Sequence, residues 1–201
     1  MKIKHKKFFS IVLYKLIFYL VFSCTSIPVT LQNLNNDSLR FASEYSLVGN
    51  DNIFVYRTAA ETANILANGT GVVFIGFKEC PWCQQYAVFL NDTAREAGIE
   101  KIFYFDILED RQNNSAVYQR IVDILDGTLQ YDDEGRPRVY VPDVTIIDSG
   151  KIIGRDYETS KDTLGYEDPK DYWTDERIDA LKKRLAESMS RINKICGACD
   201  Y

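Results

Sequence analysis

The chain has 201 residues, of which 46% are hydrophobic, which is typical of one compact domain with tails. Five lysines within the first 15 residues leave 19 basic against 29 acidic side chains elsewhere, so the body of the protein is acidic. An acidic body repels phosphate backbones, and we therefore expect no nucleic-acid partner. The one histidine, His5, lies in the basic segment. This argues against Ser-His-Asp and Cys-His catalysis and against most catalytic zinc sites.

Residues 1–23 have the pattern of a signal peptide. A basic segment over residues 1–7 precedes an apolar run over residues 8–23 that Lys15 interrupts. As a helix this run would extend about 24 Å, less than the roughly 30 Å of a bilayer's hydrocarbon core. The pattern favours a cleaved leader, with an uncleaved N-terminal anchor as the alternative.

The end of the leader contains Val21-Phe22-Ser23-Cys24, which resembles the lipobox of bacterial lipoproteins. The resemblance implies that Cys24 is lipidated and becomes the new N-terminus. It thus places the protein outside the cytoplasm, held at the membrane by lipid, with a secreted form as the alternative. Residues 25–39 are rich in Ser, Asn and Thr and predict a flexible tether within an N-terminal extension over residues 24–51.

Residues 52–195 alternate between strand and helix patterns. A short β-prone run over 53–57 is followed by Thr58 and Glu61, which supply a capping box for a helix reaching Gly69. Residues 71–77 are nearly all apolar, as in a central strand buried on both faces. The further predicted elements are a helix over 82–98, a strand over 101–106, a helix over 115–125, a polar loop over 131–138, strands over 139–147 and 151–155 joined by a tight turn, and a helix over 175–194. This order predicts an α/β domain with a central mixed sheet flanked by helices.

The junction between the apolar strand and the next helix carries Cys80-Pro81-Trp82-Cys83, and about sixty residues later Val141-Pro142 opens the predicted hairpin. This combination resembles the thioredoxin superfamily over residues 52–195. It is most similar to small thioredoxin-like proteins of Gram-positive bacteria, including the bacteriocin-transport accessory type. The resemblance implies a thioredoxin-like fold in which Pro142 is a cis-proline facing the cysteines and Val141 pairs with an extended substrate. An ordinary edge-strand proline is the alternative.

The motif has the residues that thiol–disulfide exchange requires. A cysteine at the first turn of a helix lies beside unpaired backbone N–H groups, which favour the thiolate, so Cys80 is the expected nucleophile. Cys83 can then attack the mixed disulfide that Cys80 forms with a substrate. The predicted catalytic residues are Cys80, Cys83 and Pro142, and the predicted substrate contacts are Trp82 and Val141.

Two departures from related families affect the chemistry. Thioredoxins place a buried aspartate six residues before the first cysteine, where this chain has Phe74, so proton handling must differ. The Pro-Trp pair is closer to glutaredoxins, but their Gly-Gly-Cys-Asp signature is absent, which argues against a glutathione substrate. Lys78 would lower the pKa of the Cys80 thiol and Glu79 would raise it, so the sequence leaves the sign of their joint effect open.

The C-terminal tail, residues 196–201, contains a second pair, Cys196 and Cys199. An extracytoplasmic setting lets this pair oxidise, either as a local disulfide or as a second redox pair. A zinc site joining both pairs is disfavoured because more than a hundred residues separate them. Seven aromatic residues could line a substrate surface or pack as local core: Tyr118, Tyr131, Tyr140, Tyr157, Tyr166, Tyr172 and Trp173.

The sequence thus predicts an extracytoplasmic thiol–disulfide oxidoreductase that acts on protein disulfides without a cofactor or metal. Its expected partners are protein thiols and disulfides, a further redox protein that recharges the cysteine pair, and the membrane through an N-terminal lipid or anchor. The main alternative is a non-catalytic binding protein of the same fold, an accessory to peptide export. Metal delivery is a weaker alternative because Met and His are scarce. The direction of exchange depends on a reduction potential that the sequence does not give.

Overall fold

The computed structural model describes residues 29–161 and 163–192. The chain divides into two units, residues 1–33 and 34–201, and the second is described below. The predicted signal peptide, the predicted lipidation site Cys24 and the pair Cys196 and Cys199 lie outside the described residues. Within the described ranges, no helix combines the length and the apolar character that crossing a membrane requires.

The centre of the second unit is a five-stranded mixed sheet in the order β1-β3-β2-β6-β7. Strands β1, β3 and β2 run parallel, whereas β6 and β7 are antiparallel to their neighbours. The bounds are β1 Phe54–Tyr56, β2 Gly71–Gly76, β3 Ile102–Asp106, β6 Asp143–Asp148 and β7 Lys151–Asp156. The predicted α/β class, with a mixed sheet flanked by helices, is confirmed.

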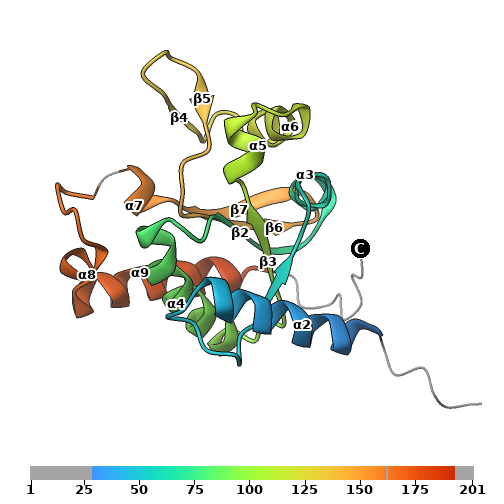
Figure 1. The fold of residues 1–201 in the computed structure, drawn as a ribbon, viewed down its shortest axis with the longest axis vertical. Helices are drawn as coiled ribbons and strands as arrows, with labels where there is room; N and C mark the ends of the chain where they lie inside the picture. The colour runs from blue at the N-terminus through green and yellow to red at the C-terminus, as the bar shows by residue number, and fades with distance from the viewer. Residues whose placement is uncertain (1–28, 162, 193–201) are drawn as a thin grey trace, which may run out of the picture. The chain divides into compact units, whose positions relative to one another are not determined.

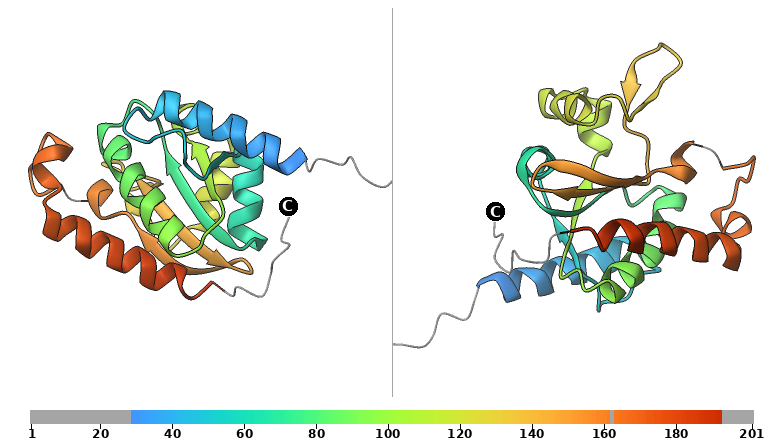
Figure 2. Two further views of the ribbon diagram at one scale, coloured as in Figure 1. Left: turned by 90° about the horizontal axis from the view of Figure 1, so that it is seen from below. Right: turned by 180° about the vertical axis from the view of Figure 1, so that it is seen from behind.

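Helices cover both faces of this sheet (Figures 1 and 2). One face is covered by α2 (Val29–Glu44, from Leu34 onward), α4 (Pro81–Glu96) and α9 (Asp175–Met189). The other is covered by α3 (Ala59–Asn68) and α6 (Ala116–Ile124), with the short α5 (Leu108–Gln112) beside α6. The remaining short elements are the hairpin of β4 (Gln130–Tyr131) and β5 (Pro137–Arg138), α7 (Glu158–Lys161) and α8 (Pro169–Tyr172).

The two hydrophobic clusters of the core lie on opposite faces of the sheet because successive side chains of a strand point in opposite directions. In β2, Val72 and Phe74 belong to the cluster under α2, α4 and α9. Val73 and Ile75 belong to the cluster under α3 and α6. The central strand is therefore buried on both faces, as its continuous apolar sequence predicts.

The predicted flexible tether over residues 25–39 differs from the structure, because α2 is helical from Val29 onward. Phe41 in this helix and Tyr45, directly after it, are fully buried, and their ring centroids lie 4.2 Å apart in a stacked arrangement. Hydrophobic burial of these rings fixes the segment against the sheet, so the folded domain begins before residue 52.

Two further predictions differ at their boundaries. The predicted polar loop over 131–138 contains paired strands: Tyr131 lies opposite Pro137, and Gly135 turns the chain with a φ of 75°. The strand predicted over 139–147 begins only at Asp143, after the proline.

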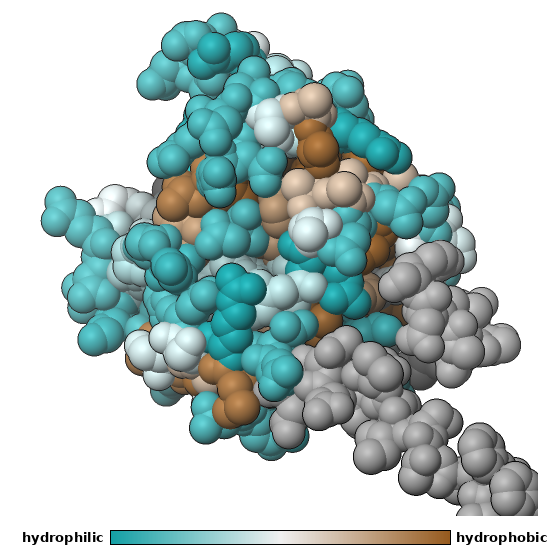
Figure 3. Space-filling model, turned by 45° about the vertical axis from the view of Figure 1, so that its right-hand side comes forward, coloured by the Kyte–Doolittle hydropathy of each residue, from teal (hydrophilic) through white to brown (hydrophobic). Residues whose placement is uncertain are grey.

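The exposed large hydrophobic side chains come from separate parts of the domain. Those among the described residues are Leu39, Leu47, Tyr131, Leu164 and Tyr166. On the face drawn in Figure 3, hydrophobic residues are interspersed with hydrophilic ones. Scattered exposure of this kind is normal for a folded domain, and none of these residues defines a docking surface.

Candidate functional site

Cys80 lies at the edge of the sheet where β2 and β3 end. The two strands are parallel, with Gly76 opposite Asp106, so the chain leaves both at this edge. Because β6 is antiparallel to β2, with Asp143 opposite Ile75, β6 begins here as well. The carboxyl ends of parallel strands are the usual position of functional residues in α/β proteins. The topology thus brings together the segments that follow β2 and β3 and the segment that precedes β6.

The two cysteines differ in position and in accessibility. Cys80 is the N-cap of α4, and Pro81 occupies the first turn, where a missing N–H costs nothing. The backbone N–H of Cys83 donates to Cys80 Sγ over 3.3 Å. Both residues are free thiols in the structure, with Cys80 7% exposed and Cys83 fully buried. Only Cys80 therefore offers surface to a substrate.

The pKa values of the two thiols also differ, and the less buried thiol has the lower pKa. The hydrogen bond from the Cys83 thiol, the backbone N–H groups of Cys83 and Trp82 and the charge of Arg111 together lower the pKa of Cys80, although burial opposes them. Burial, followed by the interaction with Cys80, raises the pKa of Cys83 well above that of an ordinary cysteine. The site therefore favours one thiolate at Cys80 and one protonated thiol at Cys83.

The segment before β6 carries the two other predicted site residues. The Val141–Pro142 peptide bond is cis, as the resemblance implies, and Val141 packs against the cluster that contains both cysteines. Directly after Pro142, the buried carboxylate of Asp143 pairs with Arg155 and accepts a hydrogen bond from Thr145 Oγ1 at 2.9 Å. Because its partners satisfy the carboxylate, it can remain buried and hold the start of β6 in place.

Arg111 is a site residue that the sequence reasoning missed. Its Cζ lies 5.3 Å from the centroid of the Phe77 ring, and its Nη1 donates to the carbonyl of Val139 over 3.2 Å. The Phe77 carbonyl accepts the backbone N–H of Cys80 at 3.1 Å. The guanidinium therefore lies between the loop that carries Cys80 and the segment that leads to Pro142. The available signal was topological, since Arg111 follows β3 and β3 ends beside β2.

The charged residues next to the motif, Lys78 and Glu79, have less effect on the pKa of Cys80 than the sequence suggested. Lys78 Nζ lies 3.9 Å from Glu79 Oε1, and both side chains are about half exposed, at 49% and 56%. They neutralise each other in solvent, which screens their effect on the nearby thiol. The positive charge that acts on Cys80 comes from Arg111 instead.

Tyr45 and Tyr104 lie close to the buried Cys83. The hydroxyl of Tyr45 donates to that of Tyr104 over 3.1 Å. A Cβ added at Gly76 would lie 3.1 Å from the Tyr45 hydroxyl and 3.3 Å from Cys83 Sγ, so both atoms approach this glycine. Burial raises the pKa of both tyrosines, which keeps them protonated. Phe74 packs against their rings, and the carboxylate of Asp106, opposite Gly76 at the end of β3, is near enough to contribute to the raised pKa of both hydroxyls.

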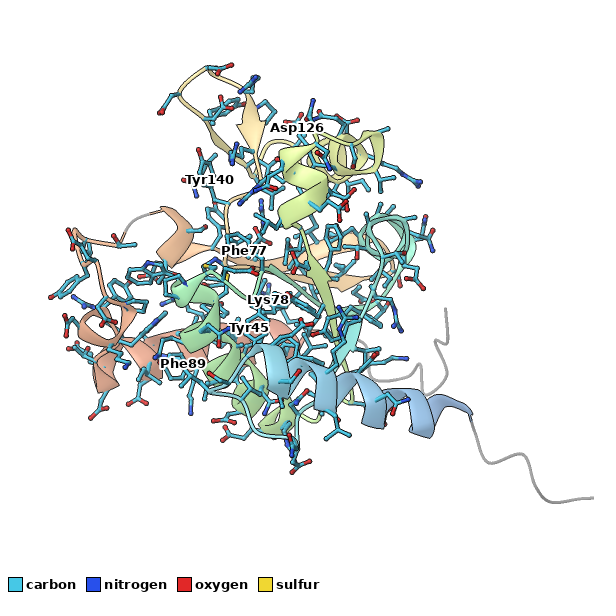
Figure 4. All side chains as sticks on the ribbon, viewed as in Figure 1. Tyr45, Phe77, Lys78, Phe89, Asp126 and Tyr140 are labelled. Atoms are coloured by element: carbon cyan, nitrogen blue, oxygen red, sulfur yellow. The ribbon has the colours of Figure 1, made fainter. Side chains whose placement is uncertain are left out.

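The labelled residues of Figure 4 show the order of these groups. In this view Phe77 lies between Tyr140, on the side of the β4–β5 hairpin, and Tyr45, on the side of α2.

Trp82 joins an aromatic cluster from the segment between β7 and α9. Its ring centroid lies 5.4 Å from that of Tyr172, which lies 4.9 Å from that of Trp173. Tyr172 and Trp173 are buried, as is Tyr118 on the opposite face of the sheet. The seven aromatic residues singled out in the sequence therefore do not form one surface. Three of them pack in the core, and Tyr172 supports Trp82.

Among the described residues, no group of three or more His, Cys, Asp or Glu side chains could hold a metal ion. Comparisons with protein-family models, with curated proteins and with solved structures find no match for this chain. The site's own geometry and the sequence motif therefore carry the functional assignment.

Proposed function

We propose that this protein is a thiol–disulfide oxidoreductase with a thioredoxin-like fold that acts on protein disulfides through Cys80 and Cys83. The observation that carries the proposal is the asymmetry of the pair. Cys80 keeps a small exposed area and has a lowered pKa, whereas Cys83 is fully buried and has a raised pKa. A nucleophile and a resolving thiol require this division, because only the first must react with an external disulfide.

The exchange can be written with the residues of the site. The Cys80 thiolate attacks one sulfur of the substrate disulfide, and the other sulfur leaves as a thiolate and takes up a proton. Cys83 then loses its proton and attacks Cys80 Sγ, which forms the Cys80–Cys83 disulfide and releases the second substrate thiol. Two electrons and two protons pass to the substrate. A dithiol partner must reduce the pair again, and the oxidising direction reverses each step.

The neighbouring groups assist these steps. The N-terminus of α4 and the charge of Arg111 stabilise the thiolate of Cys80. The hydroxyls of Tyr45 and Tyr104 lie near Cys83 and supply neutral hydrogen-bond donors as it loses its proton. Val141 and the cis-proline Pro142, at the start of β6, would pair with an extended substrate segment, as the resemblance implies.

The fold assignment rests on topology together with the motif. Three parallel strands followed by an antiparallel hairpin, with helices on both faces, are the arrangement that the resemblance implies. The motif follows the central strand, and the cis-proline opens the hairpin.

The proposed location outside the cytoplasm, with Cys24 lipidated, rests on the sequence of the leader alone. Mass spectrometry of the native N-terminus tests it, and we expect a lipid on Cys24. An intact leader, or an unmodified Cys24, would contradict the lipoprotein assignment.

Turnover of disulfide-linked insulin tests the proposed activity. We expect the full chain to catalyse insulin reduction by dithiothreitol, and Cys80→Ser and Cys83→Ser to abolish the catalysis. Cys83→Ser should also trap substrates as mixed disulfides with Cys80, because the resolving thiol is gone, whereas Cys80→Ser should trap none. A wild-type chain that neither reduces nor oxidises test disulfides would favour a non-catalytic accessory protein.

A further inference from the structure

A partly open cavity of about 470 Å³ lies between the β4–β5 hairpin and the helices α5 and α6, and Arg111, whose charge acts on Cys80, belongs to its lining. It is lined by Arg111 and Tyr118 from the helices and by Asp132, Arg136 and Arg138 from the hairpin. A side-chain carboxylate fits within such a volume. Three arginines in one cavity are unusual in a chain whose acidic residues outnumber its basic ones.

The one acidic residue in the lining is already occupied. Asp132 accepts the backbone N–H groups of Glu134 and Arg136 at 3.0 and 2.9 Å. It also pairs with the Arg136 guanidinium at 3.0 Å. Arg136 in turn contacts Glu134 at 2.8 Å. Arg136 is therefore already held by two carboxylates of the hairpin, Asp132 and Glu134.

Arg111 and Arg138 have no carboxylate partner of this kind in the described part of the chain, although the charge of Arg111 also acts on Cys80. Among the residues that the structure describes, no carboxylate forms an ion pair with either of them. Arg138 lies over the ring of Tyr140 at 5.5 Å, and Arg111 lies over that of Phe77. Burial and the neighbouring charge of Arg138 lower the pKa of Arg111, so the two cations repel each other.

Arg111 also has hydrogen-bonding capacity left over. Its Nη1 is taken by the carbonyl of Val139, whereas its Nε is buried without a partner among the described residues. A buried donor without an acceptor costs free energy. A carboxylate is the planar acceptor that matches a guanidinium, and it would also offset the repulsion between the two arginines.

We propose that Arg111 and Arg138 form a subsite that binds a carboxylate carried by the disulfide substrate, so that the protein prefers cysteines with an acidic residue nearby. This inference rests on the proposed function. Arg111 lies between the Cys80 loop and the segment before Pro142, so its position limits how far the acidic residue of a bound substrate can be from the attacked cysteine. An extended chain advances roughly 3.3 Å per residue, so the rate should depend on how many positions separate the acidic residue from the attacked cysteine.

The test uses a set of peptide disulfides that differ only in having Glu, Gln or Lys at one to four positions from the cysteine. We expect the reduced protein to react with the best Glu peptide roughly three- to tenfold faster than with its Gln counterpart, through a lower KM. The Lys peptide should be slowest, and the preference should shrink in high salt because screening weakens ion pairs.

Two variants connect the preference to the subsite. Arg138→Gln should bring the ratio of Glu to Gln rates close to one. Arg136→Gln is the matched control, since this arginine lines the same cavity but is already paired, and it should keep the ratio. Glutathione disulfide is a separate arm. A rate that falls in Arg138→Gln, but not in Arg136→Gln, would identify a small-molecule carboxylate as a ligand of the same subsite.

Binding without chemistry separates this inference from the proposed activity. The Cys80→Ser/Cys83→Ser chain should bind the Glu peptide, with its cysteine replaced by Ser, more tightly than the Gln peptide, and Arg138→Gln should remove the difference. Equal binding and equal rates for all peptides would overturn the subsite and leave the oxidoreductase intact. Failure to reduce any disulfide, with the binding preference retained, would overturn the activity alone.

Discussion

At the scale of single residues, the differences in exposure and pKa between the two cysteines predict different rates of alkylation. Because its pKa is lowered, Cys80 should react with iodoacetamide half-maximally at a pH below the roughly 8.5 of an ordinary cysteine. Cys83 is buried and has a raised pKa, so it should react far more slowly at neutral pH. The measurement is the alkylation rate of each cysteine as a function of pH, by peptide mass mapping. Equal rates would contradict the assignment of the nucleophile.

The same experiment tests whether the charge of Arg111 lowers the pKa of Cys80. Arg111→Gln removes the nearby positive charge, so the alkylation profile of Cys80 should move to higher pH, while Arg111→Lys should restore part of the shift. Lys78→Gln is the control, because Lys78 is exposed and paired with Glu79. A profile that moves with Lys78 and not with Arg111 would contradict the electrostatic description given above.

The cysteine pair and its proline could be predicted from the sequence, because a short motif carries them. The role of Arg111 could not, since it depends on three segments meeting at one edge of the sheet: the ends of β2 and β3 and the chain before β6. The tyrosine pair was missed for a similar reason. Tyr45 comes from the segment predicted as an extension, and it meets Tyr104 only through folding.

At the scale of elements, the helices with strong local signals were predicted well and the others were not. The capping box of α3 is present, with Glu61 N donating to Thr58 Oγ1 at 3.3 Å and Thr58 N donating to Glu61 Oε2 at 2.8 Å. The helix α2 has no acidic residue in its first turn and no basic residue in its last. Its helical state depends on tertiary burial of Phe41, which composition alone does not reveal.

The capping box yields a stability prediction. Thr58→Ala removes the acceptor for the N–H of Glu61 and should lower the free energy of unfolding by about 1 kcal/mol. Thr58→Ser keeps the hydroxyl and should change the stability much less. Urea unfolding of the three proteins measures the difference. Equal losses in both variants would indicate that the methyl group of Thr58, and not the cap, is responsible.

At the scale of the whole molecule, the sheet separates two hydrophobic clusters. Ile121→Val, on the buried side of α6, and Ile146→Val, in β6, should each cost about 0.5–1.5 kcal/mol. Because the two side chains lie on opposite faces, the double variant should lose the sum within about 0.5 kcal/mol. Denaturant unfolding tests this additivity. Leu185→Ala combined with Ile146→Val provides the contrast, since both side chains belong to one cluster and should couple.

The position of the aromatic cluster gives this protein a built-in optical reporter. The sequence contains two tryptophans, Trp82 between the cysteines and Trp173, and each lies within 5.5 Å of the ring of Tyr172. All tryptophan fluorescence therefore originates at or beside the proposed redox site. Conversion of the cysteine pair from thiols to a disulfide should change the emission intensity without any added dye. Trp82→Phe should abolish most of that change, and Trp173→Phe should keep it. Tryptophan emission would then report the oxidation and reduction of the cysteine pair directly.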